Sequence, residues 1–409
     1  MRHPADISGE SRRLDALAPK LMGMAGGVGL LGLIISVALA FMTEDGVRRA
    51  YHAYMVNFCY FLSISLGGLF FTLIQHLSRA GWSVVVRRLS EAVGANTLVM
   101  LVLFIPILLG MHHLFPWTSA ELLQNDPVLQ WKQPYLNAPF FLIRCAVYFG
   151  VWCGLSYFLL KRSLDQDASR DPKITLSMER MSAPGLIAFA ITLTFASFDF
   201  LMSRDYHWFS TIFGVYFFAG SFLSFMAILP VILLFLKSNG RLRHAINAEH
   251  YHDIGKLLFA MNVFWAYIAF SQFMLIWYAN LPEETGWYHR RITGDWLNLS
   301  YALLFGHFII PFLGLIGRVS KRRLRLLTPW AVWVLAMHWL DLYWLAMPEY
   351  WLRVEGAPAG TIPFSLLDLT TFLGIGGIWV AVLALWLRDH SLIPEGDPRL
   401  AESLAFENA

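Results

Sequence analysis

Hydrophobic residues occur along this chain in long uninterrupted runs, with short polar segments between them. Ten runs are long enough to cross the ~30 Å hydrocarbon core of a membrane as a helix. The pattern therefore predicts an all-α polytopic membrane protein with ten transmembrane helices. The predicted spans are Leu21–Met42, Tyr54–Leu77, Ala92–Leu114, Pro139–Leu160, Met181–Met202, Trp208–Leu236, Ile254–Leu281, Trp296–Ile316, Leu326–Met347 and Pro363–Leu387.

The composition agrees with this pattern. Hydrophobic residues make up 57% of the chain and charged residues only 14%, whereas soluble domains carry about 25% charged residues. The first run is too long for the core of a signal peptide, so we expect it to be a retained helix.

Lys and Arg are distributed unevenly between the connecting segments. Twenty-three of them fall on the side of the two termini and seven on the opposite side. Because cytoplasmic segments are enriched in Lys and Arg, both termini are predicted to be cytoplasmic. The predicted organisation is a cytoplasmic N-tail (1–20), one membrane domain (21–390) and a cytoplasmic C-tail (391–409). We interpret the basic loops as topology signals and expect no nucleic-acid binding.

Two external segments, 112–139 and 348–363, are rich in Pro and Trp and fairly apolar. They suit interfacial segments, and they suit equally a docking surface for an external partner.

A faint internal repeat links the two halves of the chain. Tyr51-His52 precedes the second span and Tyr206-His207 precedes the sixth, and three spans later an Asp follows in each case, Asp199 and Asp341. The repeat predicts two four-helix bundles of the same orientation, flanked by helices 1 and 10. The first bundle is helices 2–5 (51–203), and the second is helices 6–9 (206–347).

Four charged residues fall inside predicted spans away from their cytoplasmic ends: Arg144, Asp199, Asp341 and Asp368. All four lie in the outer half of the membrane, and ionisable residues at such depth are by default candidates for functional sites. They indicate a polar pocket or a proton path opening outward; the alternative is ion pairs that hold helices together. Arg144 and Asp199 lie at matching depth on consecutive helices and are predicted to pair. Pairing keeps Asp199 ionised, which argues against it as a proton carrier.

Histidines extend the set of candidates. His338 and Asp341 are three residues apart on one helix face, and His307 lies near the middle of helix 8. Imidazole titrates near neutral pH, so these groups could relay protons, although each His alone could equally be a hydrogen-bonded core residue. The relay candidates are Asp341, His338, His307, Asp368 and Gln272, which Asn298 and Ser300 could extend.

The chain offers no ligand pattern for a metal or redox cofactor. Its cysteines, Cys59, Cys145 and Cys153, form no CxxC motif, and no two histidines face each other at one depth, as a b-type haem requires. We therefore expect no covalently bound cofactor, no haem, no iron–sulfur cluster and no metal in this chain. An apolar groove beside its aromatic helix stripes would suit an isoprenoid tail.

The segment TFASFDFLMSRDYHWFSTIFGVYFFAGS (194–221), the ten-helix plan and the doubled bundle resemble the NrfD/PsrC-like membrane subunits. The resemblance is closest to the ActF-like subunits of bacterial alternative complex III. It implies a subunit of a quinol:cytochrome c (or other acceptor) oxidoreductase in the bacterial inner membrane, which supports quinol oxidation and conducts protons outward. Implied partners are a second NrfD-like subunit, an external iron–sulfur protein, multihaem c-type cytochromes and lipid, with haem and iron–sulfur clusters in the partners.

The resemblance also implies a menaquinol or ubiquinol pocket near the outer face. Asp199 matches the acid of helix 5 in that family, and Arg144, His112 and His207 are candidate neighbours. Two other functions remain open on the sequence: a secondary transporter, and a purely structural membrane anchor for an external iron–sulfur or cytochrome partner.

Overall fold

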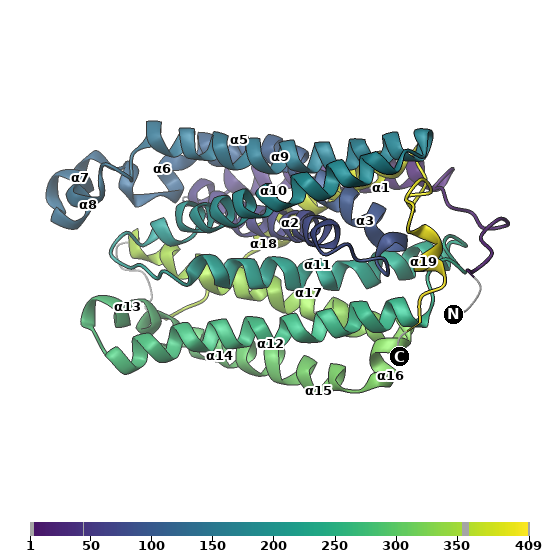
Figure 1. Cartoon of the computed structure of the whole chain (residues 1–409). Helices are drawn as coiled ribbons and strands as arrows, with labels where there is room; N and C mark the ends of the chain where they lie inside the picture. Colours follow the sequence, from purple (N-terminus) through teal and green to yellow (C-terminus); the bar gives the residue numbers. More distant parts are fainter. Residues whose placement is uncertain (1–3, 44, 354–359, 408–409) are drawn as a thin grey trace.

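The computed structural model describes residues 4–43, 45–353 and 360–407. The described part of the chain is all-helical, with 79% helix and no β-strand. Its helices lie roughly along one direction, and both termini lie at one end (Figure 1). We call this the tail end, which holds residues 4–16 and 388–407. The opposite, distal end holds the short helices α7 (Ala120–Asn125), α8 (Pro127–Lys132) and α13 (Pro282–Arg291).

Nine helical segments in the described part of the chain are long and apolar enough to cross a membrane. The chain is therefore a multi-pass membrane protein, as its hydrophobic runs predict. A further helix, α17 (Leu324–Ala346), has 23 residues, but its four tryptophans and its polar residues make it less apolar. The nine segments are α1 (Leu17–Ala40), α2 (Gly46–Leu77), α3 to α5 (Val84–Leu109), α9 (Ala138–Ser169), α10 (Pro172–Phe200) with η2 (Met202–Arg204), α11 (Phe213–Ser238), α12 (Ala248–Ala279), α14 to α15 (Asp295–Ile316) and α18 (Leu366–Leu387).

Helices α2 and α11 form the centre of the molecule. Nearly every residue of α2 from Ala53 to Leu69 is buried, and the two backbones approach closely at Gly67, where a Cβ would lie 2.2 Å from the carbonyl oxygen of Ser221. Around α2 pack α3, α10 and α18, while α12 and α17 pack on α11. The first and second halves of the chain therefore meet along the α2–α11 contact.

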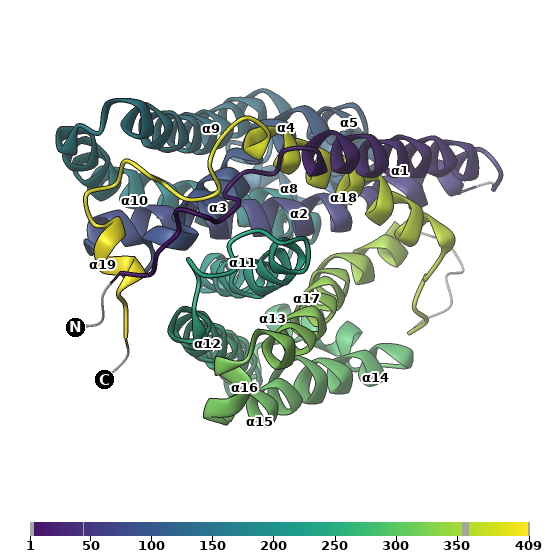
Figure 2. The ribbon, with the colours of Figure 1, turned by 90° about the vertical axis from the view of Figure 1, so that its right-hand side faces the viewer.

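The first and last long helices, α1 and α18, lie side by side (Figure 2). Small residues allow this approach: a Cβ on Gly32 would lie 2.7 Å from the amide nitrogen of Gly374. Glycines at such crossings let two membrane helices pack backbone to backbone.

Proline and glycine divide the third helical segment. It consists of α3 (Val84–Ala95), α4 (Thr97–Leu103), α5 (Ile105–Leu109) and α6 (Met111–Leu114). Pro106 lies at the start of α5 and Gly110 between α5 and α6, and proline cannot donate the backbone bond that would continue the previous helix.

The third segment also begins earlier than its hydrophobic run predicts, at Val84. Arg87, Arg88 and Glu91 thus lie inside the bundle, each at most 4% exposed. Arg88 Nε lies 3.1 Å from Glu91, and Arg87 Nη1 lies 2.6 Å from Asp397 of the C-terminal segment. Ion pairing thus allows charged side chains to be buried near the tail end as well, outside the four positions that the hydrophobic runs single out.

The remaining elements are short. Segment 112–139 forms the end of α6, η1 (Pro116–Thr118), α7 and α8 at the distal end. The other short elements are η4 (Met347–Arg353), α16 (Arg318–Arg322) and α19 (Leu400–Leu404). Parts of three predicted segments, residues 1–3, 354–359 and 408–409, lie outside the described residues.

The two tails pack together across the tail end. The amide of Leu392 donates to the carbonyl of Arg12, and the Ser403 hydroxyl donates to the carbonyl of Trp82 over 2.7 Å. The His250 ring, at the start of α12, lies 3.1 Å from the Ser403 carbonyl. The C-terminal segment thus bridges the α2–α3 turn and α12.

Candidate functional site

Arg144 and Asp199 form the ion pair that their matching depths predict. Two guanidinium nitrogens of Arg144 donate to the two carboxylate oxygens of Asp199, each over 2.8 Å, and the Tyr148 hydroxyl adds a third bond of 2.7 Å. The ring of Tyr135 lies 3.8 Å from the guanidinium carbon. Both side chains are buried, and bidentate Arg–carboxylate contacts with a further hydroxyl donor are among the strongest hydrogen-bonding arrangements in proteins.

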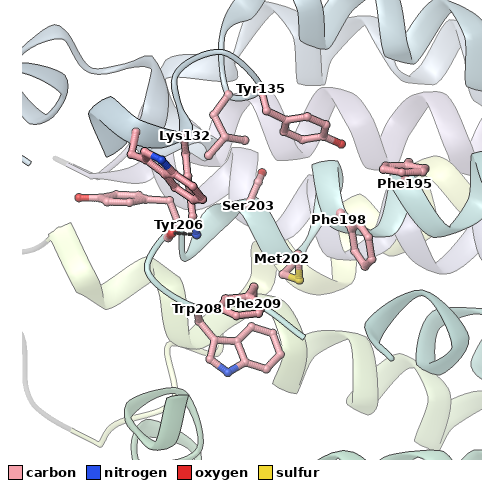
Figure 3. A pocket seen from close by; sticks show the side chains of 11 residues that line it. Lys132, Tyr135, Phe195, Phe198, Met202, Ser203, Tyr206, Trp208 and Phe209 are labelled. Carbon is pink, nitrogen blue, oxygen red and sulfur yellow. Dashed lines mark hydrogen bonds between the residues drawn. The ribbon is translucent and has the colours of Figure 1, made fainter. Parts of the chain in front are cut away.

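An apolar pocket of about 420 Å³ adjoins this pair at the distal end (Figure 3). Tyr135 and Ser203 connect the two: both line the pocket, and the Ser203 hydroxyl donates to the Asp199 carbonyl over 2.7 Å. Burial and the nearby Asp199 carboxylate raise the pKa of Tyr135 to about 12. The other lining residues are Trp131, Lys132, Leu136, Phe195, Phe198, Met202, Tyr206, Trp208 and Phe209.

The two histidines predicted to join this pocket lie elsewhere. His207 is exposed, and its Nε2 lies 2.8 Å from the Asp126 carboxylate. His112 is exposed on α6, with its ring 3.9 Å from the ring of His113. None of the four quinol-pocket candidates lines this pocket, and only Arg144 and Asp199 contact each other. The hydrophobic pattern places His207 and His112 near the outer ends of their spans but does not determine where the loops carry them.

Asp126 links α8 to the loop before α11, and this contact should depend on pH. Partial burial alone would raise its pKa, but hydrogen bonds from the Tyr206 hydroxyl and from the amides of Leu129 and Val128 lower it overall. A carboxyl whose pKa is lower in the folded state stabilises above its unfolded pKa of about 3.9 and loses that contribution as the pH falls through the folded value. We expect amide protection of α8, measured by hydrogen exchange and corrected for intrinsic rates, to fall between about pH 5 and pH 3.

The matched variant for this prediction is Asp126→Asn, whose side chain cannot titrate. It should show lower protection of α8 at pH 6 and little further change on acidification. An equal response to pH in both proteins would contradict the assignment to Asp126.

A second polar cluster lies in the half of the chain that includes α11, α12 and α17. Asp341 on α17 accepts a 2.5 Å hydrogen bond from the Tyr216 hydroxyl and a 3.1 Å bond from the Trp265 indole. All three side chains are at most 4% exposed. Asp341 thus has two neutral hydrogen-bond donors and forms no ion pair with any residue that the structure describes, in contrast to Asp199.

His307 and His338 adjoin Asp341 through Trp265. The His307 ring centroid lies 3.8 Å from that of Trp265 and 6.5 Å from that of His338. His338 Nε2 lies 2.9 Å from the Ser63 hydroxyl of α2. Both nitrogens of His307 and Nδ1 of His338 are buried without a protein hydrogen-bond partner. Buried polar atoms of this kind ordinarily bond ordered water, which makes the cluster suitable for water-mediated proton transfer.

A π-helical turn, η3 (Leu303–Ile309), carries His307 between α14 (Asp295–Ala302) and α15 (Ile310–Ile316). Its cause is Pro311, which has no amide hydrogen to donate to the His307 carbonyl four residues earlier. The amide of Ile310 instead bonds the Phe305 carbonyl. Such turns occur frequently at functional sites, and a proline four residues after a mid-helix His is the sequence signal for this one.

Gln272 lies in a chain of polar groups toward the distal end. Its amide donates to the Tyr288 hydroxyl over 3.1 Å, and its carbonyl accepts from the Ser210 hydroxyl over 2.9 Å. Burial raises the pKa of Tyr288, which the hydrogen bond from Gln272 lowers in part. These contacts link Tyr288 through Gln272 to the half-buried Ser210.

Three relay candidates do not join the cluster. Asn298 is exposed, and Ser300 bonds the Arg291 carbonyl and the Trp344 indole. Asp368, in the first turn of α18, forms an ion pair with Arg49. Arg49 lies inside α2, which begins at Gly46.

The distal end holds further ion pairs that the sequence patterns do not reveal. Arg291 and Glu349 pair at 3.2 Å, and Arg290 pairs with Asp205. Burial lowers the pKa of Arg291 to about 10. Burial also raises the pKa of Glu349, and the charge of Arg291 offsets part of that rise. In the sequence these arginines fall between hydrophobic runs, and nothing local indicates that the loops fold onto the helix ends.

Comparison with protein-family models gives no match to this chain, and comparison with curated proteins gives none either. Within the described ranges, no group of three or more His, Cys, Asp or Glu side chains is placed to hold a metal ion.

Proposed function

We propose that this protein is a membrane subunit of a quinol:cytochrome c (or other acceptor) oxidoreductase, of the NrfD/PsrC-like kind, that conducts protons toward the outer face. In this proposal α17 is the tenth transmembrane helix, both termini are cytoplasmic, and the distal end faces outward. The two four-helix bundles are then α2, α3 to α5, α9 and α10, and α11, α12, α14 to α15 and α17.

The observation that carries the proposal is the buried cluster of Asp341, His307 and His338. It combines a carboxyl bonded only by neutral donors with imidazole nitrogens that have no protein partner. Groups of this type inside a membrane protein are characteristic of proton relays. The Tyr288–Gln272–Ser210 chain supports an exit at the distal end.

The apolar pocket beside Arg144 and Asp199 supports a quinol-related role for the same face. It is lined by aromatic side chains and lies at the distal end. A quinol oxidised there would release its protons outward. In the proposal menaquinol or ubiquinol is the substrate. The electrons pass to an external iron–sulfur protein and multihaem c-type cytochromes, which assemble with a second NrfD-like subunit.

Purification of the tagged protein from native membranes tests this function. We expect it to carry partner subunits that show c-type haem absorption and iron–sulfur signals, and to oxidise a soluble quinol with cytochrome c as acceptor. Isolation as a single polypeptide without redox partners would contradict the proposal and favour the secondary transporter. Co-purification with redox partners, but with normal turnover after the proton-relay substitution described in the Discussion, would favour the structural anchor.

A further inference from the structure

An apolar groove of about 830 Å³ lies between α1, α2, α17 and α18, and it shares no lining residue with the pocket of Figure 3. Along α18 its lining extends from Asp368 to Val380, a length of about 18 Å at 1.5 Å per residue. Asp368 is the one charged residue among those that line it, and the other lining residues are mostly aliphatic and aromatic.

The carboxylate of Asp368 lies at the distal end of this groove and is only partly satisfied. Its Oδ2 forms the ion pair with Arg49 and accepts the amide of Ser365 over 2.9 Å. Its Oδ1 is buried without a protein partner, and the side chain is 1% exposed. A buried acceptor of this kind favours a ligand that donates a hydrogen bond, since leaving it unpaired is energetically costly.

Aromatic rings surround the same end of the groove. The Trp339 ring lies 6.1 Å from that of Phe364, and the Phe372 ring lies 5.6 Å from that of Tyr60; all four residues line the groove. Aromatic walls suit a flat ring, which they can contact by offset or edge-to-face packing. The groove thus joins one acceptor, an aromatic end and a long apolar channel.

We propose that this groove binds a hydroquinone with a polyprenyl tail. A ring hydroxyl donates to Asp368 Oδ1, the ring lies among Trp339, Phe364 and Phe372, and the tail follows α18 toward the tail end. A phospholipid fits less well, because a carboxylate faces the groove and would repel its phosphate, while the Arg49 guanidinium is not part of the lining. The choice of a hydroquinone over another hydroxylated ring lipid rests on the proposed function.

The position of the groove relates it to the buried cluster. Tyr60 separates the two: it lines the groove on one side, and its ring centroid lies 5.6 Å from that of His338 on the other. Asn57, one turn away on α2, accepts the Trp339 indole over 2.7 Å and donates to the Asp368 carbonyl over 3.0 Å. A ring bound at Asp368 would therefore lie within about one side chain of His338.

Photolabelling of the intact complex in nanodiscs tests the inference, with an azido-quinone carrying a prenyl tail, reduced to its hydroquinone, as the probe. We expect label on α17 and α18, removed by excess unlabelled polyprenyl hydroquinone but not by excess phosphatidylglycerol. Ala336→Phe narrows the groove from an exposed position on its wall and should reduce labelling about tenfold. Asp368→Asn, which unbalances the Arg49 pair, should reduce it by a smaller factor.

The matched control is Ala190→Phe, at an exposed position of α10 that does not line the groove; it should label like the unmodified protein. Three outcomes would overturn the inference: displacement of the label by phosphatidylglycerol, labelling only in the pocket beside Asp199, and full labelling of Ala336→Phe. The inference would also be overturned if a helix of a partner subunit covers the groove and so prevents the probe from labelling it. Failure here, with proton release still dependent on Asp341, would reject the groove site and leave the proposed function standing.

Discussion

Replacement of Asp341 by asparagine is expected to lower quinol-linked turnover and proton release by about 100-fold or more, the usual scale for loss of a positioned acid–base group. Asparagine has nearly the same shape and can keep both hydrogen bonds, accepting from the Trp265 indole and donating to the Tyr216 hydroxyl. It cannot take up or release a proton. The measurement is quinol:cytochrome c turnover together with the pH change in the lumen of proteoliposomes.

His307→Leu separates a relay from a packing role in the same cluster. The two ring nitrogens of His307 have no protein partner, so an aliphatic side chain of similar size breaks no protein hydrogen bond and should change the unfolding free energy little. Proton release should nevertheless fall as in Asp341→Asn. The matched control is Asp295→Asn, at an exposed position in the first turn of α14. It should match the unmodified protein in both unfolding free energy and proton release. Wild-type proton release in both cluster variants would reject the relay.

Replacement of Arg144 by methionine is expected to destabilise the protein by about 3–5 kcal/mol, the range observed when one partner of a buried ion pair is removed. Asp199 is 0% exposed, so the variant leaves a carboxylate in an apolar environment with only the Tyr148 hydroxyl as a side-chain donor. The free energy of unfolding can be measured by titrating the protein in bicelles with SDS.

Two further variants make this result specific. Adding Asp199→Asn should recover most of the lost stability, since no buried charge then remains and Tyr148 keeps an acceptor. Arg162→Met, at an exposed position of the same helix, should change stability by only about 0.5 kcal/mol or less. An equal loss in Arg144→Met and in the double variant would mean that the arginine stabilises by packing against Tyr135 rather than by pairing.

The asymmetry between the two Asp residues could be predicted only in part. Matching depths on consecutive helices were sufficient to pair Arg144 with Asp199, because neighbouring antiparallel helices bring such residues together. The partners of Asp341 come from α11 and α12, and those of Asp368 from the start of α2. No local pattern in the sequence relates these positions. The sequence therefore does not reveal that Asp368 pairs with Arg49 and lies outside the cluster of Asp341, His307 and His338.

The sequence alone determined that this is a helical, multi-pass membrane protein, because a membrane requires each crossing segment to be apolar over its whole length and to satisfy its own backbone. The tertiary structure alone decided which charges are buried. Arg49, Arg88 and Arg291 lie outside the hydrophobic runs, and only ion pairing and carbonyl contacts from distant segments allow them to leave water. It also decided which histidines meet. His307 and His338 lie with their ring centroids 6.5 Å apart because η3 and α17 pack together, whereas His112 and His207 remain at the surface.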